Sequence, residues 1–400
     1  MTRACIDFVR EHEHEDTARL LLSAARYPAI DMPMAVRQIE GRRTAREKWP
    51  GLSAFDEFLY PPRLNREQAS SEITAWHKCR IVSILPGGAE GLAVADLTGG
   101  MGIDSIAFAR SGMRVDYVER DPELCANMEH NRTILGLEGI DIHQGDSLQW
   151  LAGTHKLFDL IYIDPARRSV TGRKVSAFEE CEPDILQHLS LLRSSCRWLM
   201  VKASPMIDIE MGCRQLGGVS DVHIVSVRGE CKEVLFVCGD HPSETLIHCV
   251  VSDREPASYA EWTFTRSEEV MSDPLLCAAV GHYLYEPDAA LMKGGPFNLI
   301  AHRLGLEQLA RNTHLYTADT LLTPFLGRVF EVLTATPLTR KALKAALPEG
   351  CAHVLTRNYP VAAATLQQQL GLKEGGDLFV IATTVGKQRT GFLCRLVYRQ

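Results

Sequence analysis

The fold of this chain is decided by residues 92–102, Leu92-Ala-Val-Ala-Asp96-Leu-Thr98-Gly99-Gly100-Met-Gly102. A short apolar run ends in an acidic residue, passes through a glycine-rich turn and continues into the amphipathic stretch 103–110. This order predicts a β-strand, a tight loop and an α-helix whose N-terminus can hold an anionic group. Glycines in the loop remove Cβ atoms, so the backbone can turn sharply and lie directly against a ligand.

Asp96 indicates which ligand the loop holds. A carboxylate at the strand end repels a pyrophosphate but attracts an ammonium group. S-adenosylmethionine (SAM) carries an ammonium group and no phosphate, and its carboxylate can lie at the helix N-terminus. We therefore expect Asp96 to serve the amino group of SAM through water. The alternative is a dinucleotide site, because Gly100-Met-Gly102-Ile-Asp-Ser105 is one small residue away from GxGxxG, although a single match of that kind is weak evidence.

Length and composition are those of an ordinary globular protein. The chain has 400 residues, enough for two or three domains, with 46% hydrophobic and 23% charged residues. No apolar run approaches the roughly 18 residues of a membrane span, and residues 1–16 lack the apolar core of an export signal. The twelve cysteines form no CxxC pair, which predicts reduced thiols and no metal site. Together these features favour a cytoplasmic protein that contacts no membrane.

Charge is distributed unevenly along the chain. Residues 328–400 contain ten Lys/Arg and four Asp/Glu, which gives a net charge of +6. Because the whole chain has a net charge of −7, residues 1–327 carry −13. A basic module on an acidic body suggests a polyanionic partner. A solvated lysine-rich face is the alternative interpretation.

The pattern of apolar residues divides the chain into four parts. Residues 1–90 are predicted to be a helical domain, 91–241 an α/β core, 242–326 a small α+β region and 327–400 a second α/β module. In the first part, Ser70 and Ser71 are candidate N-caps of a helix that runs to about residue 85. Pro86-Gly87-Gly88 then interrupts the chain before the first predicted strand.

Strands and helices alternate in the core. Helices are expected between the first five strands, including 122–135 and 182–192, but Arg228-Gly229-Glu230 joins the last two strands as a tight turn. Five β/α units closed by an antiparallel hairpin make a mixed seven-stranded sheet, unlike an all-parallel dinucleotide fold. The predicted strands are 92–96, 114–118, 139–143, 158–163, 197–203, 220–228 and 232–239.

Four carboxylates follow the first four strands, at the edge where open α/β sheets bind ligands. Asp96 ends the first strand, and Glu119 ends the second, where it can accept hydrogen bonds from a ribose diol. Asp146 follows the third strand and can meet an adenine amino group, and Asp164 follows the fourth. Each alone would be an ordinary cap or surface acid, but four in order indicate one site. The predicted cofactor-binding residues are Asp96, Thr98, Gly99, Gly100, Gly102, Glu119, Asp121, Asp146 and Ser147.

These motifs carry a resemblance to a known family. Residues 92–240 resemble a class I SAM-dependent methyltransferase core with a Rossmann-like sheet, and the Asp-Leu-Thr-Gly-Gly-Met-Gly turn is similar to that of RNA methyltransferases. On the additional evidence of residues 283–293 and 355–360, the whole chain is identified as a bacterial methyltransferase with a C-terminal THUMP-like domain, preceded by a ferredoxin-like region. The resemblance implies SAM as cofactor and, through the THUMP-like module, tRNA or rRNA as partner.

The sequence Asp164-Pro165-Ala166-Arg167 is the candidate catalytic motif. Methylating an exocyclic base amine requires acceptors for both N–H groups, which an aspartate and a backbone carbonyl can supply, while proline adds no competing donor. The amine-methylating families that the chain resembles continue with a second proline and an aromatic residue that stacks on the base. This chain has Ala166 and Arg167 instead, and the flat arginine cation can also stack on a base.

Asp-Pro-Ala-Arg is also similar to the motif of uracil-C5 RNA methyltransferases, which need a cysteine nucleophile after the next strand. At that place the chain has Val201-Lys202-Ala203-Ser204-Pro205, and Cys196 lies at the other end of the strand, so this mechanism is disfavoured. The stretch 166–176 contains Arg167, Arg168, Arg173 and Lys174 and no acid, which suits contact with a phosphate backbone or an ordinary surface loop. Lys202 is a candidate for contact with the substrate, or for an ion pair with a neighbouring carboxylate.

The sequence thus predicts a SAM-dependent RNA methyltransferase that acts on a guanine or adenine amine. Two alternatives stay open: a SAM- and RNA-binding module without turnover, and a methyltransferase that acts on a small molecule or a protein. A nicotinamide oxidoreductase is disfavoured because nothing in the sequence supplies its substrate chemistry.

Overall fold

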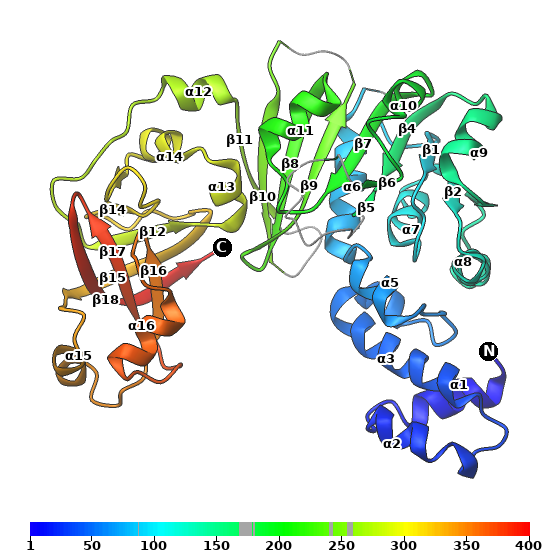
Figure 1. Ribbon diagram of the computed structural model, residues 1–400, viewed down its shortest axis with the longest axis horizontal. Helices are drawn as coiled ribbons and strands as arrows, with labels where there is room; N and C mark the ends of the chain where they lie inside the picture. The colour runs from blue at the N-terminus through cyan, green and yellow to red at the C-terminus, as the bar shows by residue number, and fades with distance from the viewer. Residues whose placement is uncertain (87, 168–177, 179–180, 240–242, 254–258) are drawn as a thin grey trace. The chain divides into compact units, whose positions relative to one another are not determined.

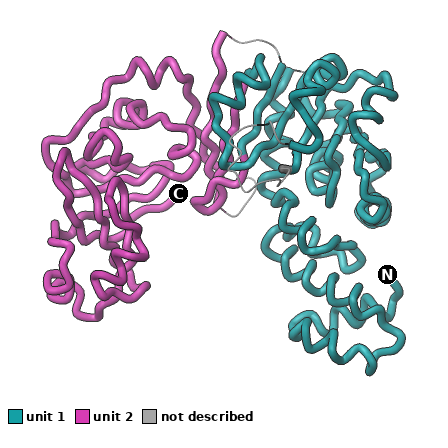
Figure 2. Tube along the Cα trace, in the orientation of Figure 1, with its two compact units in different colours: residues 1–220, 234–241 teal, residues 221–233, 242–400 magenta. Residues whose placement is uncertain are grey.

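The computed structural model describes residues 1–400 except 87, 168–177, 179–180, 240–242 and 254–258 (Figure 1). It consists of two compact units (Figure 2): unit 1 comprises residues 1–220 and 234–241, and unit 2 comprises residues 221–233 and 242–400. Across the described ranges, every helix is too short or too polar to cross a membrane.

Unit 1 begins with helices, as the sequence predicts for residues 1–90. Aspartates cap two of them, because the Asp16 carboxylate accepts the N–H of Arg19 at 2.9 Å and the Asp31 carboxylate accepts that of Met34 at 3.1 Å. Ser71 forms a capping box with Thr74 at the start of α6, which confirms the predicted N-cap. The helices are α1 (Arg3–Glu11), α2 (Thr17–Leu22), η1 (Ala24–Arg26), α3 (Met32–Lys48), α4 (Pro50–Ser53), α5 (Arg63–Gln68) and α6 (Glu72–Ile84).

The strands of unit 1 form a sheet in the order β9-β7-β4-β1-β2-β3. All neighbours are parallel except β9, which runs antiparallel to β7. The central strands β4 and β7 and the second half of β9 are almost continuously apolar and buried, as expected for strands covered on both faces. The strands are β1 (Ala93–Asp96), β2 (Arg114–Glu119), β3 (Ile140–Gln144), β4 (Phe158–Ile163), β7 (Cys196–Ala203) and β9 (Glu230–Cys238).

Helices connect these strands, and one of them differs from the prediction. Residues 182–192 were expected to form a helix, but Cys181–Glu182 is a short strand, β6, that pairs with β5 (Ala166–Arg167). The prediction of a helix from residue 182 is therefore wrong. The backbone of Glu182, the first residue of the predicted helix, is paired with Ala166 in this short sheet. The helices are α7 (Ile103–Arg110), α8 (Pro122–Ile134), α9 (Ser147–Thr154), α10 (Leu189–Ser194) and α11 (Ile209–Leu216).

Unit 2 contains β10 (Leu246–Ser252), which lies between β8 (Val219–Val227) and β11 (Tyr259–Phe264). Its second sheet has the order β13-β14-β12-β15-β18-β17-β16. These strands are β12 (Tyr283–Pro287), β13 (Glu307–Gln308), β14 (Tyr316–Ala318), β15 (Gly327–Ala335), β16 (His353–Arg357), β17 (Leu378–Val385) and β18 (Gln388–Arg399). The helices are α12 (Arg266–Met271), α13 (Ala289–Gly294), α14 (Phe297–Leu304), α15 (Arg340–Ala346) and α16 (Ala363–Leu370).

The predicted fold class is confirmed: the protein is mixed α/β, with a large Rossmann-like parallel sheet and a separate C-terminal sheet. Six of the seven strands predicted for the core belong mainly to unit 1, whereas β8 belongs mainly to unit 2. The division into four domains at residues 90, 241 and 326 stays a prediction.

Candidate active site

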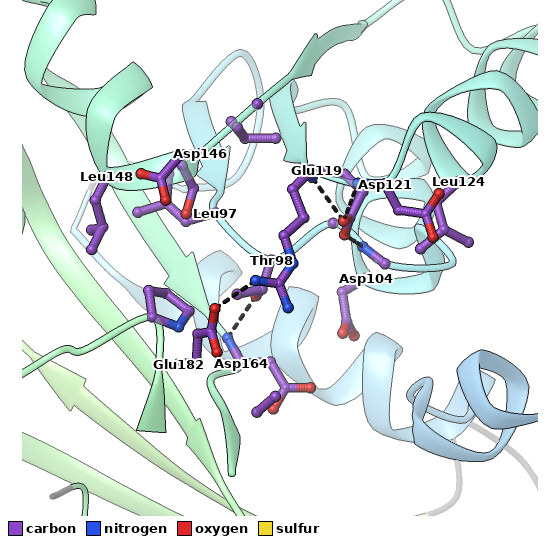
Figure 3. Close-up of a pocket in the computed structure, with 18 of the residues that line it drawn as sticks. Leu97, Thr98, Asp104, Glu119, Asp121, Leu124, Asp146, Leu148, Asp164 and Glu182 are labelled. Atoms are coloured by element: carbon purple, nitrogen blue, oxygen red, sulfur yellow. Dashed lines mark hydrogen bonds and ion pairs between the residues drawn. The ribbon is translucent and has the colours of Figure 1, made fainter. Parts of the chain in front are cut away.

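A cavity of about 750 Å³ opens at the carboxyl ends of β1, β2, β3 and β4 in unit 1 (Figure 3). Two sets of residues line it. The strand-end wall consists of residues 97–104, 118–121, 124, 145–149, 152, 164 and 166. The helical wall consists of residues 65, 68–70, 182–184, 187, 188 and 191, which come from the N-terminal helical region and from the segment that leads into α10. The edge of the parallel sheet that was predicted to bind a ligand therefore lines a cavity.

The glycine loop fits closely against β2 and α8. A Cβ on Gly99 would lie 2.2 Å from the Tyr117 ring, and one on Gly102 would lie 2.7 Å from Met128 Sδ. Gly102 also has a backbone φ of +82°, which residues other than glycine rarely adopt. The loop is fixed further by the Tyr117 hydroxyl, which donates to the Gly100 carbonyl at 2.7 Å. The glycines therefore allow the loop to pack closely against Tyr117 and Met128, with its other side toward the cavity.

Asp96 lies behind the cavity wall. Its carboxylate is 1% exposed and accepts hydrogen bonds from the Thr98 N–H at 3.1 Å and the Ser105 hydroxyl at 2.6 Å. Burial raises the pKa of Asp96 to about 7, and the negative charge of Asp104 adds to this, although the hydrogen bond from Ser105 opposes it. The carboxylate positions the loop, and its predicted contact with a ligand ammonium group stays a prediction.

Glu119, at the end of β2, lies in the cavity wall as expected. Its carboxylate accepts backbone N–H groups of Gly100 at 2.8 Å, Arg120 at 2.7 Å and Asp121 at 2.9 Å. These bonds tie the glycine loop to the start of α8 and fix the carboxylate beside the cavity. The other predicted cofactor-binding residues that line the cavity are Thr98, Gly99, Gly100, Gly102, Asp121, Asp146 and Ser147.

Asp121 and Asp146 cap the helices that follow β2 and β3. The Asp121 carboxylate accepts the N–H of Glu123 at 2.8 Å, and the Asp146 carboxylate accepts the N–H of Gln149 at 2.9 Å. Each cap is an ordinary helix-starting contact, and it also holds the carboxylate at the cavity edge. The cap interpretation is confirmed at these positions, and the binding of a cofactor there stays a prediction.

Asp164 follows β4 and reaches the cavity from the centre of the sheet. Its backbone N–H donates to the Thr98 hydroxyl at 2.7 Å, so the loops after β1 and β4 are joined at this point (Figure 3). Its carboxylate forms an ion pair with Lys202 of β7, whose side chain is 14% exposed. The sequence left open whether Lys202 contacts the substrate or pairs with a neighbouring carboxylate. The structure shows the ion pair, and its partner is the candidate catalytic acid.

The helical wall is anchored by a buried ion pair that the sequence analysis missed. Lys78 of α6 is 0% exposed and lies 3.1 Å from Asp104, which lines the cavity. The Asp104 carboxylate also accepts the hydroxyls of Ser70 at 2.7 Å and Tyr162 at 2.9 Å. Burial raises the pKa of Asp104, but the positive charges of Lys78 and Lys202, with these hydrogen bonds, outweigh it and hold the pKa below its usual value.

The second part of the helical wall carries Glu182 and His188. The Glu182 carboxylate lies 2.5 Å from the Arg120 guanidinium, so this ion pair connects the two walls (Figure 3). Sequence reasoning missed both residues, because no motif surrounds them. Asp104 had a visible signal, an acid directly after the glycine turn, but such an acid is also typical of a helix start.

Several predicted substrate contacts fall outside what the structure describes. Arg168, Arg173 and Lys174 lie outside the described residues, and Arg167 is placed by its backbone, which pairs with Cys181. Pro165 follows Asp164 directly and is half-buried. Their roles stay predictions.

The uracil-C5 alternative gains nothing from the geometry. Cys196 lies at the start of β7, whereas Lys202 and Ala203 form its cavity end. Burial raises the pKa of the Cys196 thiol to about 12, and the thiol lies 3.2 Å from the Leu192 carbonyl. A thiol in this state is a poor nucleophile.

Comparison with known proteins fits this architecture. Family models match a ferredoxin-like domain at residues 283–325 and a THUMP-like domain at residues 327–396. The crystal structure of a candidate methyltransferase from Porphyromonas gingivalis W83 matches 99% of this chain and 98% of its own, with 30% sequence identity and a TM-score of 0.83. A search of curated proteins found no match.

Two further solved structures match more weakly. A candidate class I SAM-dependent methyltransferase from Listeria monocytogenes has 9% identity and a TM-score of 0.40, over 64% of this chain and 95% of its own. A 16S rRNA N2 G1207 methyltransferase from Thermus thermophilus has 14% identity and a TM-score of 0.34, over 43% of each chain. Similarities as weak as these two establish neither a shared substrate nor a shared activity.

The sheet, the glycine loop, the cavity at its edge and the match over the whole chain define a class I methyltransferase. The chain belongs to the family of SAM-dependent methyltransferases that carry a C-terminal THUMP-like domain.

Proposed function

We propose that this protein transfers a methyl group from SAM to an exocyclic amine of guanine or adenine in tRNA or rRNA, in the cytoplasm. SAM is expected in the cavity of unit 1, with its ribose near Glu119 and its adenine near Asp146. Glu119 and Asp146 both line the cavity, which supports this placement.

The observation that carries the proposal is the position of Asp164. This acid lies at the cavity end of β4, beside the glycine loop, and Lys202 and Thr98 hold its side chain and backbone. A carboxylate fixed there can accept one N–H of a base amine while the Pro165 carbonyl accepts the other. Holding both hydrogens aims the nitrogen lone pair at the methyl donor.

Chemistry requires that the amine lose one proton as it gains a methyl group. Asp164 is the proposed acceptor of an amine N–H, and it can hold that proton before solvent removes it. Lys202 is a positioning residue, because it contacts the carboxylate of Asp164. Nothing in this arrangement requires a covalent bond between enzyme and base.

The C-terminal part of the chain supports the proposal that the substrate is RNA. Residues 327–396 match a THUMP-like domain, and residues 328–400 carry a net charge of +6. A basic module of this kind suits a phosphate backbone, whose binding weakens strongly as salt increases. A substrate that is a small molecule or a protein would leave this basic module without a role.

The test is transfer of tritium from methyl-labelled SAM to total RNA of a strain that lacks this protein. We expect Asp164→Asn to lower turnover by about 100-fold or more, because a positioned polar group at the reacting atom is typically worth that much. SAM affinity should stay within a few-fold. Asp159→Asn is the matched control: Asp159 lies on the same strand, where it accepts the Ala93 N–H at 2.9 Å.

Each outcome separates the alternatives. Unchanged turnover in Asp164→Asn would remove the catalytic role of this acid. RNA that binds but never acquires label, under any salt condition, would favour a module without turnover. Label that appears on protein or small molecules while RNA stays unlabelled would replace the substrate class.

A further inference from the structure

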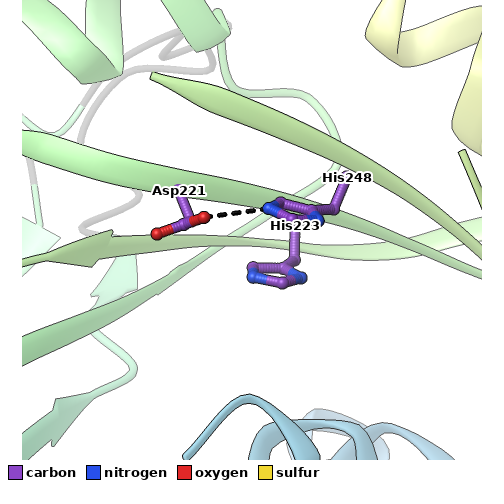
Figure 4. Close-up of side chains that lie close together, drawn as sticks. All are labelled: Asp221, His223 and His248. Carbon is purple, nitrogen blue, oxygen red and sulfur yellow. Dashed lines mark hydrogen bonds and ion pairs between the residues drawn. The ribbon is translucent and has the colours of Figure 1, made fainter. Parts of the chain in front are cut away.

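A cluster of charged and imidazole side chains lies on β8, β10 and β11 of unit 2, apart from the residues assigned to the cavity (Figure 4). Asp221 and His223 are two residues apart on β8, so their side chains lie on the same face of the strand. His248 of β10 is the register partner of His223. Glu261 of β11 belongs to the neighbouring antiparallel strand.

The side chains of this cluster converge. Asp221, His223 and His248 each offer one ligand atom, and these atoms all lie within 4.8 Å of one another. The distance between His248 Nε2 and Asp221 Oδ1 is 2.9 Å. The His223 side chain is buried at 1% exposure, whereas the Asp221 side chain is 26% exposed. The cluster is therefore enclosed on the histidine side and reached by solvent at Asp221.

Glu261 adds an independent observation. Its carboxylate lies 2.6 Å from His248 Nδ1, on the side of the ring opposite Asp221. In metal sites, a histidine that binds the ion through one nitrogen almost always donates its other N–H to a carboxylate, carbonyl or water, which fixes the tautomer. Glu261 would fix the His248 ring in this way and leave Nε2 for the ion.

We propose that Asp221, His223 and His248 bind a divalent transition-metal ion, with Zn²⁺ as the ion to be tested. Imidazole nitrogens suit zinc and its neighbours, and a carboxylate completes a set of two histidines and one acid. Three protein ligands leave a further coordination position for water or an anion. The cysteine pattern gave no hint of this site, because none of its ligands is a thiol.

Binding requires one local adjustment. The rings of His223 and His248 are stacked, with centroids 4.2 Å apart and planes 7° apart, so their in-plane lone pairs run parallel. One ring must turn about its Cβ–Cγ bond to aim a nitrogen at a shared ion, and this torsion is soft. The proton that His248 shares with Asp221 leaves to solvent as the metal–nitrogen bond forms.

The full-length protein, treated with a chelator and then dialysed, tests the proposal by titration with Zn²⁺ against a chromophoric competitor. We expect one equivalent to bind and the thermal unfolding temperature to rise with Zn²⁺ concentration. Asp221→Asn and His248→Gln should abolish stoichiometric binding. Glu261→Gln should weaken it by about 10- to 100-fold, because that residue orients a ligand without contacting the ion.

His353→Gln is the matched control. His353 Nδ1 lies 2.8 Å from Glu374 in an exposed pair of unit 2, so this variant removes a histidine–carboxylate contact outside the cluster. It should bind zinc like the wild type. If His248→Gln fails to fold, the more exposed Asp221→Asn and Glu261→Gln carry the test.

Absence of a stoichiometric site in the wild type would overturn the proposal. So would equal zinc affinity in Asp221→Asn, Glu261→Gln and the wild type. Either result would leave His248 as a ring held between the carboxylates of Asp221 and Glu261 without a metal ion.

Discussion

The two walls of the cavity are built by different means. The strand-end wall takes Glu119, Asp146 and Asp164 from positions at or just after the ends of β2, β3 and β4, so each of these acids is placed by the strand that precedes it. The helical wall takes its residues from two segments distant in sequence, between 65 and 70 and between 182 and 191, and a buried ion pair holds its first part in place. One wall is thus encoded locally, and the other depends on tertiary contacts.

The largest effect is expected from Lys78→Met, which removes the cation that compensates Asp104. Lys78 is 0% exposed, and breaking a buried ion pair typically costs about 3–5 kcal/mol. We expect this loss in the free energy of unfolding, measured by urea denaturation, with weaker SAM binding at the same cavity. The double variant Lys78→Met/Asp104→Asn should recover a large part of the stability, since it leaves no unpaired charge.

A loss below about 1 kcal/mol in the single variant would mean that the helical wall does not depend on this pair. The two walls would then differ in sequence origin but not in how they are stabilised.

A smaller effect, dependent on pH, is expected at Asp96, which lies behind the strand-end wall. The pKa of Asp96 is about 7 in the folded protein and about 3.9 in an unfolded chain, so the folded state holds this proton more tightly. Its contribution to stability is therefore present in full below about pH 4 and is lost as pH rises to about 7 and beyond. At about 1.4 kcal/mol for each pKa unit, the loss amounts to at most about 4 kcal/mol.

Asp96→Asn should lack this dependence, so its stability relative to the wild type should increase between pH 4 and 8, as measured by urea denaturation at several pH values. Ser105→Ala sharpens the test, because it removes a hydrogen bond that favours the ionised carboxylate and should move the transition to higher pH. Parallel curves for Asp96→Asn and the wild type would contradict the assignment.

The smallest effect is expected where the walls meet, at Arg120 and Glu182. Their side chains are 71% and 39% exposed, and ion pairs in such settings contribute at most about 1 kcal/mol. A double-mutant cycle with Arg120→Gln and Glu182→Gln should therefore give a coupling energy below about 1 kcal/mol. A coupling above about 2 kcal/mol would show that the two walls act as one rigid body.

The sequence predicted most of the fold because the strands carry clear apolar runs between turn residues. β4 has the bounds that were expected, and α8 ends one residue earlier than expected. The predicted helix from residue 182 failed because the backbone at 181–182 pairs with 166–167. A local pattern cannot reveal a partner that lies across a loop.

The same limit of local patterns explains which site residues could be predicted from the sequence. Glu119, Asp146 and Asp164 line the cavity as their places after strands predict, whereas Asp96 is turned inward to Thr98 and Ser105. Ser70 and Glu182 reach the cavity through packing, which the sequence does not display. The Asp221–His223–His248 cluster depends on the register between β8 and β10, and this register is set by the sheet.

The fully enclosed ammonium group of Lys78 limits how this protein can be divided. An excised segment that starts at residue 91 would lack that lysine and would leave Asp104 with a negative charge and no cation from α6. The predicted boundary at residue 90 therefore separates helices from the sheet, but we do not expect the two parts to fold independently of each other. Engineering or recombination that exchanges the catalytic portion must carry α6 with it.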